Sequence, residues 1–363
     1  MRKPHLILVL SILFCACGRE QSGADRQLSW RIEHVWSVGG ATDNAISLSD
    51  VEPFQVASNG VDEIYVLDRM SSRVFALDLQ GAVIDTLGMK GSGPGEFEDP
   101  WAIAVDQRGT VAVLDVGNRR VVRWGADGRV LDALPVREMI EHPKMVVQSG
   151  EVLFTMADHS RDGPREFRLM AFGPTASRIL ARLERPPLRL GNLPSCHATD
   201  ISLVPIFMPA IHWDAAGDRV AVNSGPEYQI QLYRSGVVSG TAHRPIAPVA
   251  ATQALAEAEV GAWRFNDCLV PPAEVVQASG FRNVVPVIQA LALSPQGDLW
   301  VLRHTEDGTH TAVDLFDSTG AYQGTLQAGG LFPAAFIGLD RIVVVEKGVD
   351  DIPRVSLYAI ARR

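Results

Sequence analysis

The sequence lacks any cluster of lysine and arginine side chains. Its 33 basic and 42 acidic residues leave a formal net charge of -9. Nonspecific affinity for nucleic acid arises when clustered cations neutralise backbone phosphates. We therefore expect no nucleic-acid partner.

Long apolar runs are also missing near the start of the chain. The run from Leu6 to Phe14 has about nine residues, whereas a helix that crosses a hydrocarbon core needs roughly 20. Arg2 and Lys3 precede this run, and the small residues Ala16 and Cys17 follow it, which is typical of a signal peptide. We therefore expect export rather than a permanent transmembrane helix.

The end of this leader resembles a bacterial lipobox, in which cleavage occurs before a cysteine that receives the lipid. Ala16 precedes Cys17 as in a lipobox, but Phe14 stands where leucine is usual, so cleavage by ordinary signal peptidase is the alternative. The resemblance implies a lipoprotein anchored through Cys17 in the bacterial cell envelope. Gly18 replaces the aspartate that often retains lipoproteins at the inner membrane, which favours the periplasmic face of the outer membrane.

Cysteine is scarce in the rest of the chain, where Cys196 and Cys268 stand 72 residues apart. An oxidising envelope compartment permits a disulfide between them. Closing a loop of this length would contribute about 4 kcal/mol in the chain-entropy model. Two unpaired buried thiols are the alternative.

Sequence motifs of common enzymes are absent as well. There is no G-x-S-x-G elbow, no H-E-x-x-H and no P-loop. The glycine-rich GSGPG at residues 91–95 precedes a predicted strand rather than a helix, so we interpret it as a turn. These absences weaken an enzymatic interpretation without excluding it, because some folds assemble a site from scattered residues.

An internal repeat is present and sets the organisation of the chain. Residues 53–81 (PFQVASNGVDEIYVLDRMSSRVFALDLQG) align with residues 100–128 (PWAIAVDQRGTVAVLDVGNRRVVRWGADG). Each copy has three β-rich runs separated by Gly, Asn, Asp or Ser turns, and a fourth run, VLDALP, follows at residues 130–135. This pattern predicts consecutive antiparallel strands.

The stretch from Gly91 to Gly128 resembles an NHL repeat, because it carries G-x-G-P-G-x-F, I-A-V-D and D-x-x-N-x-R-V in order. Weaker copies retain a turn and an alternating apolar strand, at residues 144–172, 208–233, 287–316 and 334–358. The resemblance implies an all-β, six-bladed β-propeller of four-stranded antiparallel blades, in the TolB-like propeller superfamily. A seventh blade would require a copy hidden in an insertion.

The predicted domains are a signal peptide at residues 1–16, a tether at 17–29 and one propeller at 30–363. The last repeat copy lacks its fourth strand, and the run WRIEHVWSVGG at residues 30–40 suits that place. Pairing the two ends of the chain would remove exposed sheet edges. We therefore expect the N-terminal strand to close the ring.

Two long insertions interrupt the repeats, at roughly residues 177–207 and 241–286. The composition of residues 251–265 favours a helix, and residues 271–280 begin with prolines and end in glycine as a short helix does. Each insertion contains one of the two cysteines, Cys196 or Cys268. A disulfide between them would hold both insertions together over one face of the propeller. The alternative is a packing cap without a ligand.

The ends of the second strands are predicted to point toward the face that carries the insertions, and five of the six are polar. By alignment they are Asp68, Asp115, Met156, Asn223, Arg303 and Glu346. The candidates for a ligand face are Asp68, Asp115, Asn223, Arg303 and the adjacent His304. The NHL resemblance also implies a structural role for Asp115, which would bond the turn together with Asn118 and Arg120. Asp68 and Arg73 are open to the same interpretation.

These observations favour a noncatalytic binding or scaffold propeller that recognises a protein, peptide or glycan of the envelope on its insertion-bearing face. We predict no catalytic residue, cofactor or metal. The alternative is a metal-dependent lactonase or lyase, because propeller enzymes of these types hold an ion on the central axis. The histidines near this face are His159, His197, His212 and His304, and none has a spacing diagnostic of a metal site. A structural component of an envelope assembly is a third interpretation.

Overall fold

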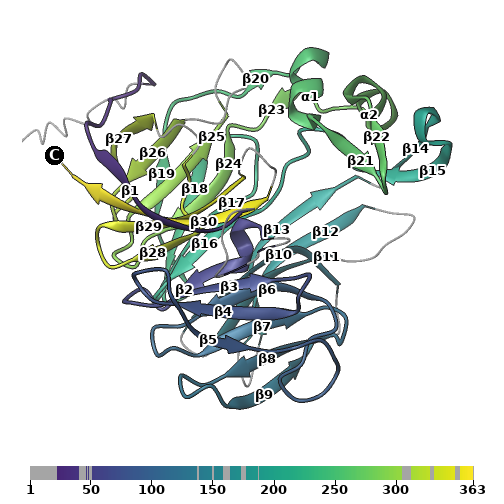
Figure 1. The fold of residues 1–363 in the computed structure, drawn as a ribbon. Helices are drawn as coiled ribbons and strands as arrows, with labels where there is room; N and C mark the ends of the chain where they lie inside the picture. Colours follow the sequence, from purple (N-terminus) through teal and green to yellow (C-terminus); the bar gives the residue numbers. More distant parts are fainter. Residues whose placement is uncertain are drawn as a thin grey trace, which may run out of the picture.

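The structure is a computed structural model. It describes residues 23–40, 46, 48, 51–136, 139–148, 151–157, 164–172, 177–186, 188–304, 312–327, 331–347 and 352–362. Six four-stranded antiparallel sheets follow one another around the ring (Figure 1). The chain is a six-bladed β-propeller, as the repeats predict.

The first three blades take their strands in chain order. Blade 1 contains β2 (Val56–Ser58), β3 (Ile64–Asp68), β4 (Arg73–Leu77) and β5 (Val83–Leu87) after a 3-10 turn, η1 (Pro53–Gln55). Blade 2 contains β6 (Pro100–Val105), β7 (Val111–Asp115), β8 (Arg120–Trp124) and β9 (Val130–Pro135). Blade 3 contains β10 (Met139–Gln148), β11 (Glu151–Ala157), β12 (Arg165–Phe172) and β13 (Ser177–Arg185).

The second half of the ring includes the strand that closes it. Blade 4 contains β16 (His212–Ala216), β17 (Arg219–Asn223), β18 (Gln229–Arg234) and β19 (Val237–His243). Blade 5 contains β24 (Ile288–Leu293), β25 (Leu299–Arg303), β26 (Ala312–Phe316) and β27 (Tyr322–Gln327). Blade 6 contains β28 (Ala335–Ile337), β29 (Arg341–Lys347), β30 (Pro353–Ala361) and the N-terminal β1 (Arg31–Gly39).

The hydrophobic core lies between neighbouring blades. Leu67 and Val74 of blade 1, for example, pack in one buried cluster with Ile103 and Val113 of blade 2. Inner strands such as β7 are buried on both faces and are therefore apolar up to the last residue, Asp115, whereas the outer strand β9 is mostly exposed. Stacking blades thus buries surfaces that no single blade could cover.

The ends of the chain meet in blade 6, as predicted. Strand β1 pairs antiparallel with β30, with Arg31 opposite Ala361 and Gly39 opposite Arg354. The Trp36 indole then donates a hydrogen bond of 2.8 Å to the carbonyl of Leu79 in blade 1. Ring closure therefore joins the first and last parts of the chain and leaves no open sheet edge between them.

The two insertions form a small cap beside the ring, seen at the upper right of Figure 1. The first insertion contributes β14 (Arg189–Leu193), η2 (Pro194–Cys196) and β15 (Ala198–Leu203). The second contributes β20 (Val249–Ala250), α1 (Gln253–Val260), β21 (Trp263–Phe265), β22 (Cys268–Val270), α2 (Pro272–Ser279) and β23 (Val284–Val285).

The predicted starts of both insertions are wrong. Residues Ser177–Arg185 form β13, the fourth strand of blade 3, and residues 241–243 complete β19 in blade 4. Both are outermost strands that face solvent, so their sequences lack the apolar alternation that identifies the inner strands. The helix expected at residues 251–265 is also shorter, because Gly261 ends α1 with a φ of 55° and a β-hairpin follows.

The predicted tether is wrong for residues 23–29, which lie along blade 5. Gln27 forms a parallel bridge with Thr325, and the Leu28 amide donates to the Thr325 carbonyl at 2.9 Å. The Thr325 amide in turn donates to the Arg26 carbonyl at 2.8 Å. The predicted signal peptide and the predicted lipidation site, Cys17, lie outside the described residues. Within the described part of the chain, no helix is long and apolar enough to span a membrane.

Candidate functional site

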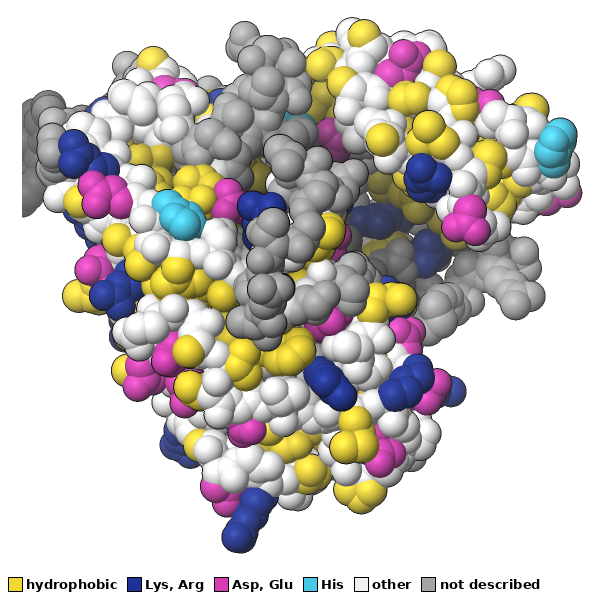
Figure 2. Space-filling view, in the orientation of Figure 1, with side chains coloured by type: hydrophobic (Ala, Val, Ile, Leu, Met, Phe, Trp, Pro, Cys, Tyr) yellow, Lys and Arg dark blue, Asp and Glu magenta, His cyan; other side chains and the backbone are white. Residues whose placement is uncertain are grey.

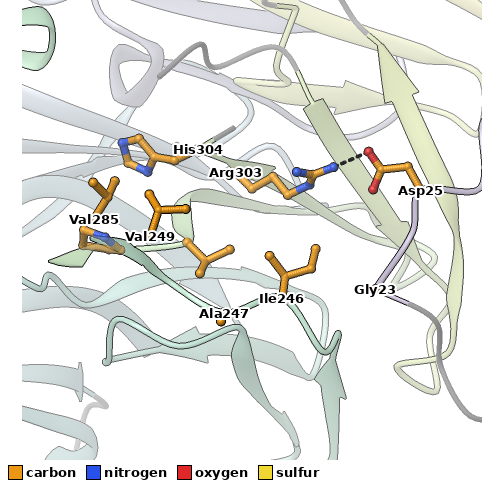
Figure 3. A pocket seen from close by; sticks show the side chains of 10 residues that line it. Gly23, Asp25, Ile246, Ala247, Val249, Val285, Arg303 and His304 are labelled. Atoms are coloured by element: carbon orange, nitrogen blue, oxygen red, sulfur yellow. Dashed lines mark hydrogen bonds and ion pairs between the residues drawn. The ribbon is translucent and has the colours of Figure 1, made fainter. Parts of the chain in front are cut away.

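A pocket of about 340 Å³ lies between blade 5, the base of the cap and the N-terminal segment (Figure 3). One side is aliphatic and comes from the two ends of the second insertion. The polar side chains are Arg303 at the end of β25, the adjacent His304, and Asp25 of the N-terminal segment. The lining residues are Gly23, Asp25, Ile246, Ala247, Val249, Val285, Pro286, Val287, Arg303 and His304.

Two of the predicted face residues, Arg303 and His304, line this pocket. Arg303 is the last residue of β25, and only 10% of its side chain is exposed. Its position at the end of a second strand directs it toward the face that carries the cap. The repeat alignment thus named two residues that the structure places side by side in the wall of this pocket.

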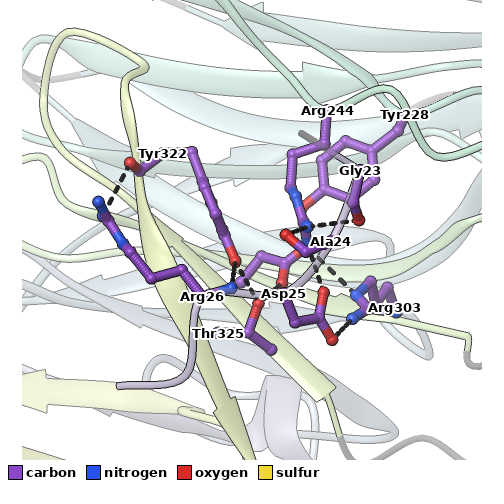
Figure 4. Close-up of polar contacts among 10 residues, drawn as sticks. Gly23, Ala24, Asp25, Arg26, Tyr228, Arg244, Arg303, Tyr322 and Thr325 are labelled. Carbon is purple, nitrogen blue, oxygen red and sulfur yellow. Dashed lines mark hydrogen bonds and ion pairs between the residues drawn. The ribbon is translucent and has the colours of Figure 1, made fainter. Parts of the chain in front are cut away.

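A charge network links Arg303 to Asp25 at the pocket wall and to the buried Arg244 and Asp314 behind it (Figure 4). Arg303 contacts Asp25 through Nη2 and lies 3.3 Å from Asp314 through Nε. Arg244 Nη1 contacts the same two carboxylates, at 3.0 Å from Asp25 and 2.9 Å from Asp314. The side chains of Arg244 and Asp314 are fully buried. Two guanidinium groups are thus matched by two carboxylates, as buried charges require.

Two hydroxyl groups complete the surroundings of Asp314. Tyr228 donates to Asp314 Oδ2 at 2.8 Å, and Thr325 donates to Oδ1 at 2.6 Å. Burial, and then the neighbouring Asp314 carboxylate, raises the pKa of Tyr228 well above its usual value, so the phenol stays a donor. Burial lowers the pKa of Arg244, but the charges and hydrogen bonds of its partners, Asp314 first and then Asp25, together outweigh this effect and the net shift is upward. Arg244 therefore remains charged.

Arg244 also binds the backbone of the N-terminal segment. Its Nη2 donates to the carbonyls of Gly23 and Ala24, each at 2.9 Å. The Arg244 guanidinium lies 4.2 Å from the centre of the Tyr322 ring, which supports it from blade 5. The N-terminal segment that precedes β1 is therefore bound at the edge of the pocket by the charge of Asp25 and by hydrogen bonds to its backbone.

His304 connects the pocket to the cap. Its Nε2 lies 3.5 Å from a carboxylate oxygen of Glu259 on α1, and its ring packs edge-on against Phe207 at 6.4 Å. Phe207 belongs to a cluster with Ala256 of α1 and Val276 of α2. Movement of the cap would therefore change the shape of this side of the pocket.

Cys196 and Cys268 form a disulfide between the two insertions, with their Cα atoms 5.9 Å apart. Leu193 from the first insertion packs in one cluster with Val270 and Val275 from the second. The cap is therefore a single body with its own core. Its outer surface shows hydrophobic side chains (Figure 2), and the exposed ones include Leu188, Leu190, Val204, Leu269 and Phe281.

Asp115 is fully buried and its carboxylate is used within blade 2. Oδ1 accepts hydrogen bonds from the amides of Glu98 and Asp99 at 3.1 and 3.0 Å. Oδ2 accepts from the Asn118 side chain at 2.6 Å. These contacts give Asp115 a structural role, as the NHL resemblance implies, and it does not line the pocket.

Asp68 and Asn223 also end second strands, are buried and do not line the pocket. Asn223 donates to the carbonyls of Glu227 and Gln229, at 3.1 and 3.0 Å, and so holds the following turn. The sequence interpretation placed them on the same face as Arg303, but the structure does not bring them into the same pocket.

Three residues of the network, Asp25, Arg244 and Asp314, were missed by the sequence interpretation. Asp314 gave a signal, because a carboxylate stands in the middle of the buried strand AVDLF and must have a partner. Asp25 lay in the predicted tether, and Arg244 lay in the predicted insertion. Neither position has a pattern that indicates burial.

The histidines named for a metal site are dispersed. His159 lies outside the described residues, His197 is in the cap next to Cys196, and His212 begins β16. Among the described residues, no group of three or more His, Cys, Asp or Glu side chains could hold a metal ion.

Comparisons with known proteins agree with the architecture. The family described as "6-bladed beta-propeller" (DUF5128) matches residues 44–166, which is less than half of the chain. Protein lin-41 of Caenorhabditis elegans is 50% identical over 46 residues, and the match spans 13% of this chain and only 4% of that protein.

Two solved structures share the fold over nearly the whole chain. A member of the DUF4221 family from Bacteroides vulgatus has a TM-score of 0.54 at 7% identity, covering 93% of this chain and all of the other. A protein named as exported from Bacteroides fragilis has a TM-score of 0.51 at 12% identity, covering 95% and 98% of the two chains. Identity this low shows the fold alone.

Proposed function

We propose that this propeller is a noncatalytic binding module of the bacterial cell envelope, which recognises a protein, peptide or glycan at the junction of blade 5 and the cap. The observation that carries the proposal is the pocket itself, which combines an aliphatic wall with the partly buried Arg303. Ligand sites typically occupy about 300–1,000 Å³ and pair apolar walls with a few placed polar groups. The pocket fits the lower end of this range.

The position of the pocket supports the same role. Rigid strands hold Arg303, while the second insertion supplies Ile246, Val249 and Val285. Loops that carry specificity on a rigid scaffold are a common arrangement in binding proteins. The exposed apolar side chains of the cap extend the surface beyond the pocket, so a partner larger than the pocket would also contact the cap.

The leader supports a place in the envelope. We propose that the protein is exported as an NHL-like propeller lipoprotein, with Cys17 carrying the lipid on the periplasmic face of the outer membrane. The test is metabolic labelling of cells with an alkyne-bearing fatty acid. The wild-type chain is expected to take up label and Cys17→Ala to lose it. Equal labelling of both chains would refute the anchor.

Binding at the pocket can be tested by photo-crosslinking in intact cells. A photoreactive amino acid at Ala247, an exposed pocket residue, is compared with one at Val61, which is 63% exposed in a turn of blade 1. We expect a discrete adduct from position 247 that weakens at least tenfold with Arg303→Gln, and none from position 61. Equal adducts from both positions would place binding elsewhere.

A further inference from the structure

The N-terminal segment contributes one charge to a site whose other charges belong to the propeller. Arg303 and Asp314 lie in β25 and β26, and Arg244 directly follows β19. Asp25 reaches both arginines from the start of the described chain (Figure 4). The network therefore has three members held by the blades and one supplied by a separate segment.

The separate member is also the most exposed one. About 34% of the Asp25 side chain is exposed, whereas the exposed fractions of Arg244 and Asp314 are zero and that of Arg303 is 10%. Asp314 provides a single negative charge beside two buried guanidinium groups. A second anion is required at the place that Asp25 occupies, because an uncompensated buried charge is strongly destabilising.

Asp25 stands at the wall of the pocket (Figure 3). A ligand in the pocket is therefore adjacent to Arg303 and to the position of the Asp25 carboxylate. The neighbouring wall consists of aliphatic side chains, including Ile246, Val249 and Val285, and no aromatic ring other than that of His304 lines the pocket within the described residues. This combination suits a carboxylate attached to an aliphatic group.

We propose that the pocket binds an aliphatic carboxylate, that Arg303 receives the ligand's carboxylate, and that Asp25 occupies this anion position until the ligand displaces it. The inference rests on the proposed function and names the chemical class of its ligand. A fatty acid and the C-terminus of a peptide with an aliphatic last residue share this chemistry.

Displacement of Asp25 does not require the ring to open. Residues 26–28 are held independently, because Arg26 and Leu28 exchange backbone hydrogen bonds with Thr325. The Arg26 amide also donates to the Tyr322 hydroxyl at 3.1 Å. The segment can therefore release Asp25 and the preceding residues while β1 stays in blade 6.

The first test is rescue of Asp25→Asn by acetate, measured by thermal unfolding of the chain beginning at residue 18. The variant keeps the shape of the side chain but removes its charge, so we expect a lower Tm than in the wild type. Acetate at ten times its dissociation constant is expected to raise this Tm by about 2 °C more than chloride at equal ionic strength. The wild type and the double variant D25N/R303Q are expected to show no acetate-specific rise.

The second test asks whether the aliphatic wall contributes. Octanoate is expected to bind Asp25→Asn more tightly than acetate, by about fourfold for each methylene that is buried. Octanamide, which lacks the charge, is the matched control and is expected not to bind. N-acetyl-Val-Val and its C-terminal amide test a peptide ligand in the same way. Tighter binding of octanoate would favour a fatty acid as the natural ligand, and tighter binding of N-acetyl-Val-Val would favour a peptide C-terminus.

Absence of acetate-specific rescue in a folded Asp25→Asn would overturn the proposal, as would equal binding of octanoate and octanamide. If that variant does not fold, calorimetric titration of the wild type with octanoate carries the test, with Arg303→Gln as the control. We then expect binding that Arg303→Gln abolishes, and no binding to the wild type would overturn the proposal. The crosslinks from position 247 are scored separately, so rescue without crosslinks contradicts only the proposed cellular function, and crosslinks without rescue contradict only the aliphatic-carboxylate site.

Discussion

Blades 2 and 5 both bury a network of charged groups, but they assemble it from different distances along the chain. In blade 2, Asp115 and Arg120 lie 3.6 Å apart, and Arg120 donates to the carbonyl of Gly93, 27 residues away. In blade 5, Asp314 is paired with Arg244, 70 residues away, and Arg244 with Asp25, 219 residues away. The first network is contained within one repeat and its entry loop, and the second joins three segments.

This difference sets a network that is only structural apart from one that also borders a pocket. The carboxylate of Asp115 is fully occupied inside its own blade and faces no pocket. The network of blade 5 opens onto a pocket through Arg303 and depends on a residue outside the repeats. The local contacts of Asp115 thus fix the loop that enters blade 2. In the network of blade 5, by contrast, the proposed ligand can replace one contact, that between Asp25 and Arg303.

The largest expected effect comes from Asp314→Asn, which leaves two buried guanidinium groups with one carboxylate. Removing one partner of a buried ionic pair costs about 3–5 kcal/mol. Guanidinium chloride unfolding of the chain beginning at residue 18 is expected to show a loss of this size, against less than about 0.5 kcal/mol for the exposed control Asp340→Asn. A loss below about 1 kcal/mol for Asp314→Asn would mean that the long-range network does not hold the ring together.

Replacing Cys196 and Cys268 by serine tests a second long-range connection. The bond closes a loop of 72 residues, and its removal is expected to cost up to about 4 kcal/mol. Denaturant unfolding of the double variant is compared with that of the wild type after reduction, and the two midpoints should agree. If reduction leaves the wild-type midpoint unchanged, the packing between Leu193 and Val270 is sufficient to hold the cap.

A smaller effect is expected from Asn118→Ala in the local network of blade 2. Its side chain donates to Asp115 at 2.6 Å and to the carbonyl of Gly91 at 3.0 Å, and the loss is expected to be about 1–2 kcal/mol. Adding this change to Asp25→Asn should leave the acetate response unaltered, because distant sites without shared partners behave additively. An altered response would show that the two blades are coupled and would break the comparison.

The fold was predictable because each repeat carries its own turns and strands. The copy at Gly91–Gly128 specified three strands of its blade, the run at residues 130–135 specified the fourth, and the missing last strand indicated closure by residues 30–40. The pairing of Cys196 with Cys268 was also foreseeable, because the chain after Cys17 offers no other cysteine. Outer strands such as β13 were missed, since no residue of β13 is fully buried and its sequence lacks the clear apolar pattern on which prediction depends.

The candidate site was predictable only in part. Alignment singled out Arg303 and His304, which line the pocket, because the end of a second strand is a repeating position. The partners Asp25 and Arg244 could not be found in this way, since their places are set by tertiary packing and not by the repeat. A buried charge such as Asp314 indicates that a partner exists, but it does not indicate where in the chain that partner lies.

The smallest expected effect concerns Tyr358 in blade 6, a local contact at the point where the chain ends meet. Its hydroxyl donates to both carboxylate oxygens of Glu346 at 3.0 Å, and its ring packs edge-on against His34 of β1 at 5.4 Å. Burial, followed by the hydrogen bond to Glu346 and the charge of Glu346, raises the pKa of Tyr358 from 10.0 to about 12. The unfolded chain therefore loses this proton first as pH rises, so the stabilisation is complete below pH 10 and is lost between pH 10 and 12. Thermal unfolding across this range should show a shallower fall in Tm for Tyr358→Phe than for the wild type, and identical slopes would mean that this contact adds nothing to ring closure.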